Sequence, residues 1–163
     1  MTESLPELAA KLQELAIGRG VTVATAESCT GGAIAQQITS ISGSSAYFKG
    51  SVAAYANDVK HRVLGVPTDV LESPGAVSEA CARAMAEGIR TLMAVDFAVS
   101  TTGIAGPLGG TERKPVGLVY LGVASAERRE VEEHIFPGDR AAVIEAATVR
   151  ALELLIDAVS ENC

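Results

Sequence analysis

The chain has 163 residues, of which 48% are hydrophobic, and a formal net charge of −7. This length supports one domain with a full core, and basic residues occur only in small isolated groups, which excludes an ordinary nucleic-acid-binding surface. The chain has no apolar run of about 18 residues and no basic N-terminal start, so we expect no membrane span and no signal peptide. Its three cysteines stand at unrelated spacings, which predicts neither a disulfide framework nor a zinc site. We therefore expect a cytoplasmic protein.

The first elements of the chain are a helix, a buried strand and a second helix. Ser4 and Glu7 form a predicted capping box for a helix from Ser4 to Ile17, which ends at Gly18-Arg19-Gly20. The short β-branched run from Val21 to Ala26 is almost uncharged and predicts a buried strand. Helix-like sequence follows from Ala33 to Ile41, so the chain turns sharply between this strand and this helix.

The middle of the chain predicts a strand followed by two helices. The segment from Tyr47 to Ala56 is typical of a strand, interrupted at Gly50. Asn57 is the predicted cap of a short helix that ends before Gly65. Ser78 is the predicted cap of a helix from Glu79 to about Ala94, whose inner side we expect to carry Cys81, Met85, Ile89 and Leu92.

The C-terminal half adds three strands and a long helix. Phe97 to Thr101 reads as a buried strand that opens into a glycine-rich loop. Two hairpin strands, from Val116 to Ala124 and from Val131 to Phe136, precede a helix from Asp139 to about Val159. The alternation indicates an α/β fold, and the two late adjacent strands indicate a mixed sheet rather than an all-parallel one.

Two strands end in glycine-rich loops that carry hydroxyl groups. If they are parallel neighbours, Ser28 and Thr102 face the same crevice beyond the carboxyl ends of the strands. The free N–H groups of a helix start favour an anion or a developing oxyanion there. Neither loop matches a P-loop, a dinucleotide fingerprint or the GxSxG elbow. The alternative is that Ser28 or Thr30 only caps the helix.

A nucleophilic serine needs a base, and the chain offers few. The only histidines are His61, beside a lysine, and His134, among glutamates on a predicted outer strand. Lys60 follows Tyr55 by five residues, and both side chains can converge on a neighbouring crevice. A lysine acts as a base only when burial or a nearby cation keeps it neutral. The alternative is that Lys60 is an exposed residue of the helix with no role in catalysis. Cys29 is a rival nucleophile or a small buried residue.

Five segments, spread over nearly the whole chain in order, resemble the CinA C-terminal domain family: ATAESCTGG (24–32), YANDVKHRVLGV (55–66), GAVSEACARAMAEG (75–88), TTGIAGPLGGTERKPVG (101–117) and GDR (138–140). The family includes the stand-alone nicotinamide-nucleotide amidase. The resemblance implies a three-layer α/β/α sandwich with a mixed, mostly parallel central sheet, as a single domain over residues 1–163. It also implies hydrolysis of nicotinamide mononucleotide to nicotinate mononucleotide and ammonia.

The resemblance assigns the reaction to three residues of this chain. Ser28 matches the nucleophile, Lys60 matches the lysine that activates it, and Tyr55 matches the tyrosine beside this pair. The backbone N–H groups of Cys29, Thr30 and Gly31 would hold the oxyanion.

The remaining site residues are expected to bind the substrate. Thr102 matches a threonine of the second loop and, with Gly103, Ala105 and Gly106, would hold the ribose or the ring. Arg140 matches an arginine near the nucleotide end of the substrate. Relatives often carry a second basic residue four positions later, where this chain has Ile144.

The expected partner is a small-molecule nucleotide, with no metal, organic cofactor, nucleic acid or membrane. The apolar composition also favours a homo-oligomer. Two other functions fit the same sequence. One is a non-catalytic nucleotide-binding module. The other is an amidase for a different small carboxamide, which is plausible because Ile144 stands where relatives often carry a basic residue.

Overall fold

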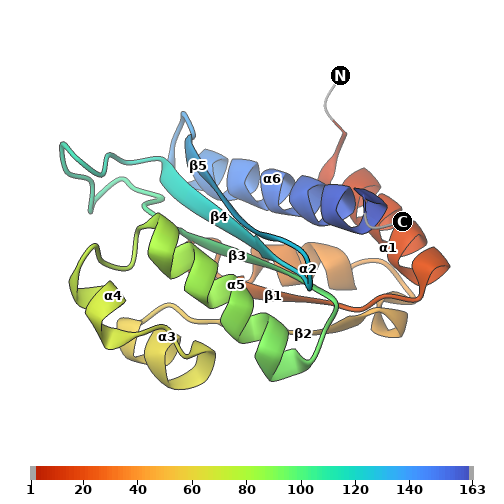
Figure 1. Ribbon diagram of the computed structural model, residues 1–163. Helices are drawn as coiled ribbons and strands as arrows, with labels where there is room; N and C mark the ends of the chain where they lie inside the picture. The colour runs from red at the N-terminus through yellow and green to blue at the C-terminus, as the bar shows by residue number, and fades with distance from the viewer. Residues whose placement is uncertain (1–2, 162–163) are drawn as a thin grey trace.

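The structure, a computed structural model, describes residues 3–161, which form a five-stranded sheet between two layers of helices (Figure 1). The order across the sheet is β2-β1-β3-β4-β5. β1 pairs in parallel with β2 and β3, whereas β4 is antiparallel to both β3 and β5, so β4 alone runs against the others. The predicted mixed, mostly parallel sheet is confirmed, with strands at Val23–Glu27, Phe48–Ala53, Phe97–Gly103, Leu118–Ala124 and Arg129–Ile135.

The helices divide between the two faces of the sheet, which confirms the three-layer sandwich. One face is covered by α1 (Leu5–Arg19), α2 (Ala33–Thr39) and α6 (Arg140–Glu161), whose leucines, isoleucines and valines form the larger core (Figure 1). The other face is covered by α5 (Glu79–Met93), against which α3 (Asn57–Leu64) and α4 (Thr68–Glu72) pack. No helix within residues 3–161 combines the length and apolarity needed to cross a membrane.

Local signals placed most helix ends correctly. Ser4 and Glu7 form the predicted capping box, and Gly20 ends α1 with a φ of 66°. The Ser78 hydroxyl accepts a hydrogen bond from the Cys81 N–H, as expected of a cap. The predicted cap at Asn57 is wrong, because Asn57 is already the first helical residue and its neighbour Ala56 occupies the cap position.

The expected inner row of α5 is wrong at its last position. Cys81, Met85 and Ile89 are buried, but Leu92 is 52% exposed. Met93, four residues after Ile89, continues the row and packs against the core on this side of the sheet. A helical row repeats every three to four residues, and here the four-residue spacing persists.

α3 lies very close to α5 because the facing position on α5 is a glycine. A Cβ atom on Gly88 would lie 1.9 Å from the Leu64 carbonyl oxygen, at the end of α3. This contact is with rigid backbone, so a side chain at Gly88 would push α3 outward. The position of α3 matters for the site, because α3 carries Lys60.

We predict that Gly88→Ala destabilises the protein by about 1–3 kcal/mol, because the added methyl group overlaps a backbone carbonyl. The control is Gly18→Ala in α1, where an added Cβ meets nothing within 4 Å. That change should be neutral or stabilising by up to about 1 kcal/mol, because alanine costs less conformational entropy in a helix. Urea unfolding of both variants measures the difference, and equal stabilities would contradict the close approach of α3.

Candidate active site

A cavity of about 200 Å³ lies at the carboxyl ends of β1 and β3. These strands are parallel neighbours, so the predicted crevice shared by Ser28 and Thr102 is present. Most of the residues singled out from the sequence meet here, although Thr30, Gly31 and Gly106 do not line the cavity. Its lining consists of Ser28, Cys29, Tyr55, Asn57, Lys60, Ala76, Val77, Thr102, Gly103, Ala105 and Arg140.

A buried carboxylate that the sequence analysis missed organises the turn between β1 and α2. Glu27 is fully buried, and its oxygens accept hydrogen bonds from the N–H groups of Gly32, Ile34 and Ala35 at 2.9–3.1 Å. The Thr30 hydroxyl donates to the same carboxylate at 2.7 Å. Glu27 therefore satisfies the free donors of the helix start and places a negative charge at its positive end. The sequence does carry a signal for this role of Glu27: an acidic residue at the end of a predicted strand, a few residues before a glycine-rich helix start.

Glu27 leaves the Ser28 side chain free of a structural role. Gly32 is the N-cap of α2 and, having no side chain, makes no cap bond. The Thr30 hydroxyl also lies 2.8 Å from the Thr101 hydroxyl, which fixes it within the turn. Within residues 3–161 the Ser28 hydroxyl bonds to no protein group, and Ser28 lines the cavity. The alternative in which Ser28 caps the helix is therefore wrong.

The three predicted oxyanion donors differ in availability. The Gly31 N–H donates to the Ser28 carbonyl oxygen at 3.0 Å, because the chain turns tightly there. This bond removes Gly31 from the predicted set. The N–H groups of Cys29 and Thr30 remain as candidates, and only Cys29 of these lines the cavity.

Lys60 is buried rather than an exposed helix residue. Only 2% of it is exposed, and its Nζ donates to the Tyr55 main-chain carbonyl at 3.0 Å. Leu64, one turn later on α3, is buried on the same side. Burial lowers the pKa of the Lys60 ammonium below its ordinary value of 10.5, since the charged form loses its water. Burial therefore shifts Lys60 toward the neutral amine, compared with an exposed lysine.

Cys29 lines the same cavity but is poorly suited to attack. Burial raises the pKa of its thiol to about 11, so the thiol is protonated near neutral pH. The histidines lie elsewhere: His61 Nδ1 is 2.8 Å from the Val66 carbonyl oxygen, and His134 Nε2 is 2.8 Å from Glu132 on β5. Neither lines the cavity. The geometry therefore brings Ser28 and Lys60, the predicted nucleophile and base, to the same cavity.

Tyr55 and Arg140 form the outer rim of the cavity. Tyr55 is 62% exposed, and its hydroxyl accepts a hydrogen bond from Arg140 at 3.0 Å. Arg140 also donates to the Gly106 carbonyl oxygen at 2.7 Å. The Tyr55 hydroxyl is thus bound to Arg140, while the Tyr55 main-chain carbonyl accepts the hydrogen bond from Lys60. Gly106 contributes by fixing Arg140.

Thr102 and the start of the second loop are held tightly. The Thr102 hydroxyl donates to the Ala76 carbonyl oxygen at 2.7 Å, so only its lone pairs remain for a ligand. A Cβ atom on Gly103 would lie 2.5 Å from the Leu118 carbonyl oxygen, which explains the need for glycine there.

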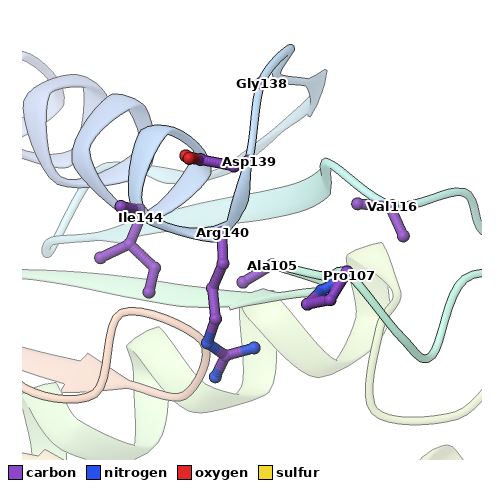
Figure 2. Close-up of a pocket in the computed structure, with 8 residues that line it drawn as sticks. Ala105, Pro107, Val116, Gly138, Asp139, Arg140 and Ile144 are labelled. Atoms are coloured by element: carbon purple, nitrogen blue, oxygen red, sulfur yellow. The ribbon is translucent and has the colours of Figure 1, made fainter.

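A second, larger cavity adjoins the first. It has a volume of about 690 Å³ and shares Ala105 and Arg140 with the smaller cavity. Figure 2 shows Arg140 extending from the start of α6, with Ile144 on one side and Ala105 and Pro107 on the other. Within residues 3–161, no three His, Cys, Asp or Glu side chains gather closely enough to hold a metal ion.

Comparison with known proteins supports one family over almost the whole chain. A model of the CinA C-terminal domain matches residues 5–159. A CinA-like protein from Leptospira borgpetersenii is 44% identical over 162 residues, which are 99% of this chain. A CinA-like protein from Geobacter sulfurreducens is 50% identical over 137 residues, or 84% of this chain. The chain spans only 39% and 33% of the length of these two curated relatives.

Solved structures match the chain at full length. The competence/damage inducible protein CihA from Agrobacterium tumefaciens superposes with a TM-score of 0.93 at 40% identity, covering 98% of both chains. The competence damage-inducible protein A from Klebsiella pneumoniae gives a TM-score of 0.95 at 32% identity and covers 99% of this chain and 100% of its own.

We predict that Glu27→Gln destabilises the protein by at least about 1–3 kcal/mol. An amide offers one acceptor oxygen and one donor, so a backbone N–H of the α2 start would face another donor in a buried site. Glu72→Gln, an exposed change on α4, is the matched control and should have little effect. Thermal unfolding of both variants tests this, and a Glu27→Gln protein as stable as the control would contradict the role of the carboxylate.

Proposed function

The chain belongs to the CinA C-terminal domain family, and from this premise we propose that it is a serine amidase. Its proposed reaction is hydrolysis of the carboxamide of nicotinamide mononucleotide to nicotinate mononucleotide and ammonia. The observation that carries the proposal is the pairing, in one cavity at a helix start, of an unengaged Ser28 hydroxyl with a buried Lys60 amine.

The reaction proceeds in two steps. The Ser28 oxygen attacks the carboxamide carbon while Lys60 accepts the serine proton, and Lys60 then gives a proton to the departing ammonia. Water hydrolyses the resulting acyl-enzyme, with Lys60 again taking a proton. A lysine in this role must start neutral, and burial lowers the pKa of Lys60 in that direction.

The negative oxygen of each tetrahedral intermediate needs donors that are in place beforehand. The N–H groups of Cys29 and Thr30 are proposed for this role, at the positive end of α2. Losing one such donor typically lowers the rate by about 10²–10³-fold. The Glu27 carboxylate keeps the turn that carries these groups rigid.

The rest of the substrate extends toward Arg140. Thr102, Gly103 and Ala105 are proposed to contact the ring or the ribose. Among residues 3–161 the Arg140 guanidinium donates only to uncharged oxygens, of Gly106 and Tyr55, so its charge is free to attract the phosphate.

We predict that Ser28→Ala lowers ammonia release from nicotinamide mononucleotide by about 10³-fold or more, because it removes the attacking oxygen. Cys29→Ala is the matched control and should keep most of the activity, since alanine retains the backbone N–H at position 29. Ammonia release by the purified variants, with a melting curve for each, decides the roles. A dead Cys29→Ala enzyme beside an active Ser28→Ala enzyme would reverse the assignment. Tight binding of the mononucleotide by the wild type without ammonia release would instead indicate a binding module.

We predict that Lys60→Arg is nearly as damaging as Lys60→Ala, because arginine keeps the positive charge but does not give up a proton near neutral pH. The wild-type kcat/KM should rise with pH as Lys60 loses its proton, with a midpoint below 10.5 because burial lowers this pKa. Lys49→Arg, an exposed change on β2, is the control and should leave the profile unchanged. A Lys60→Arg enzyme near the wild-type rate would rule out the base.

A further inference from the structure

The larger cavity gives the candidate active site room for more than a mononucleotide. Ligand pockets typically have volumes of about 300–1,000 Å³, a range that includes this cavity of about 690 Å³ but not the smaller one of about 200 Å³. Ala105 and Arg140 belong to both, so the two cavities adjoin. A substrate whose carboxamide reaches Ser28 therefore passes Arg140 before it enters the larger cavity.

The lining of the larger cavity is apolar apart from the start of α6. Its apolar side chains come from both the second loop and α6: Ala105, Pro107, Val116, Ala141 and Ile144. Such a surface binds an uncharged apolar or aromatic group by removing apolar area from water. With its phosphate at Arg140, as proposed above, a mononucleotide would end there and leave this surface exposed to water.

The charges at the junction favour an anion with one negative charge over an anion with two, because one cation is present and the neighbouring carboxylate repels a second charge. Arg140 is the one cationic residue among those lining the larger cavity, and Asp139 beside it is acidic. Asp139 accepts a hydrogen bond from the Ala142 N–H, which holds its carboxylate at the helix start. A phosphate monoester carries a charge of about −1.5 to −2 at neutral pH, whereas a phosphate diester carries one negative charge.

We propose that the preferred substrate is a carboxamide nucleotide whose phosphate is a diester. The one charge of the diester pairs with Arg140, and its apolar or aromatic substituent occupies the cavity beside Ile144. This inference rests on the proposed function, because the carboxamide end is placed at Ser28. Ile144 sets the preference for a diester over a monoester. It lies one helical turn after Arg140 and places a branched hydrocarbon side chain there.

Direct binding to the Ser28→Ala protein tests the inference without turnover. The probes are nicotinamide mononucleotide and its phenyl phosphodiester, compared by titration calorimetry. Burial of the phenyl ring should give the diester a Kd about ten- to a hundredfold lower than that of the mononucleotide. Equal binding, tighter binding of the mononucleotide, or no binding of the diester would overturn the inference.

A substitution at Ile144 tests the specificity. Ile144→Lys, also made in the Ser28→Ala protein, should strengthen mononucleotide binding and weaken diester binding, because it adds a cation and removes apolar surface. Glu145→Gln is the matched control, since it raises the net charge by the same amount outside the cavity and should leave the ratio of the two Kd values unchanged. If Ile144→Lys does not fold, the comparison of the two ligands on the Ser28→Ala protein still decides.

Ammonia release by the wild type separates the two proposals. Tighter binding of the diester without ammonia release from either compound would support the subsite and contradict the amidase. Hydrolysis of the mononucleotide together with no preference for the diester would support the amidase and contradict the subsite.

Discussion

The hydrogen bonds from the start of α2 to the buried Glu27 carboxylate are the interaction on which the candidate site depends. A buried carboxylate is costly unless several donors surround it, and here three backbone N–H groups and the hydroxyls of Thr25, Thr30 and Ser51 do so. This arrangement fixes the strand end, the turn and the helix start as one unit. Because the carboxylate satisfies the helix start, the Ser28 hydroxyl next to it remains unengaged and faces the cavity.

The second constraint is the close contact between α3 and α5. Glycine at position 88 allows the end of α3 to approach the backbone of α5, and this approach buries the side of α3 that carries Lys60 and Leu64. Burial removes water from the Lys60 amine, which is the physical cause of its lowered pKa. The proposed nucleophile and base thus depend on different parts of the sandwich. Ser28 depends on the turn after β1, and Lys60 depends on packing against the helical layer on the other face.

Arg140 lines both the small cavity and the larger apolar cavity. It comes from the start of α6, more than a hundred residues after Ser28, and its guanidinium is held by the Gly106 carbonyl and the Tyr55 hydroxyl. Both partners are uncharged, so the bonds orient the side chain without neutralising it. A charge held in this way suits recognition of an anion at the boundary between the two cavities.

The sequence by itself determined the order of the elements, the mixed sheet, most helix ends and the convergence of Ser28 with Thr102. These follow from short-range patterns: apolar periodicity, capping residues and the rule that parallel neighbouring strands end at one edge of a sheet. Spacing made Lys60 a candidate base beside the alternative of an exposed helix residue, whereas family resemblance favoured the base and singled out Arg140. The tertiary structure alone decided that the Glu27 carboxylate accepts hydrogen bonds from the start of α2, that the Gly31 N–H is already engaged and that the Tyr55 hydroxyl binds Arg140. It also decided that Lys60 is buried. Each of these depends on backbone or side-chain groups brought close by packing, and hydrogen-bond partners and burial are set by that proximity rather than by position along the chain.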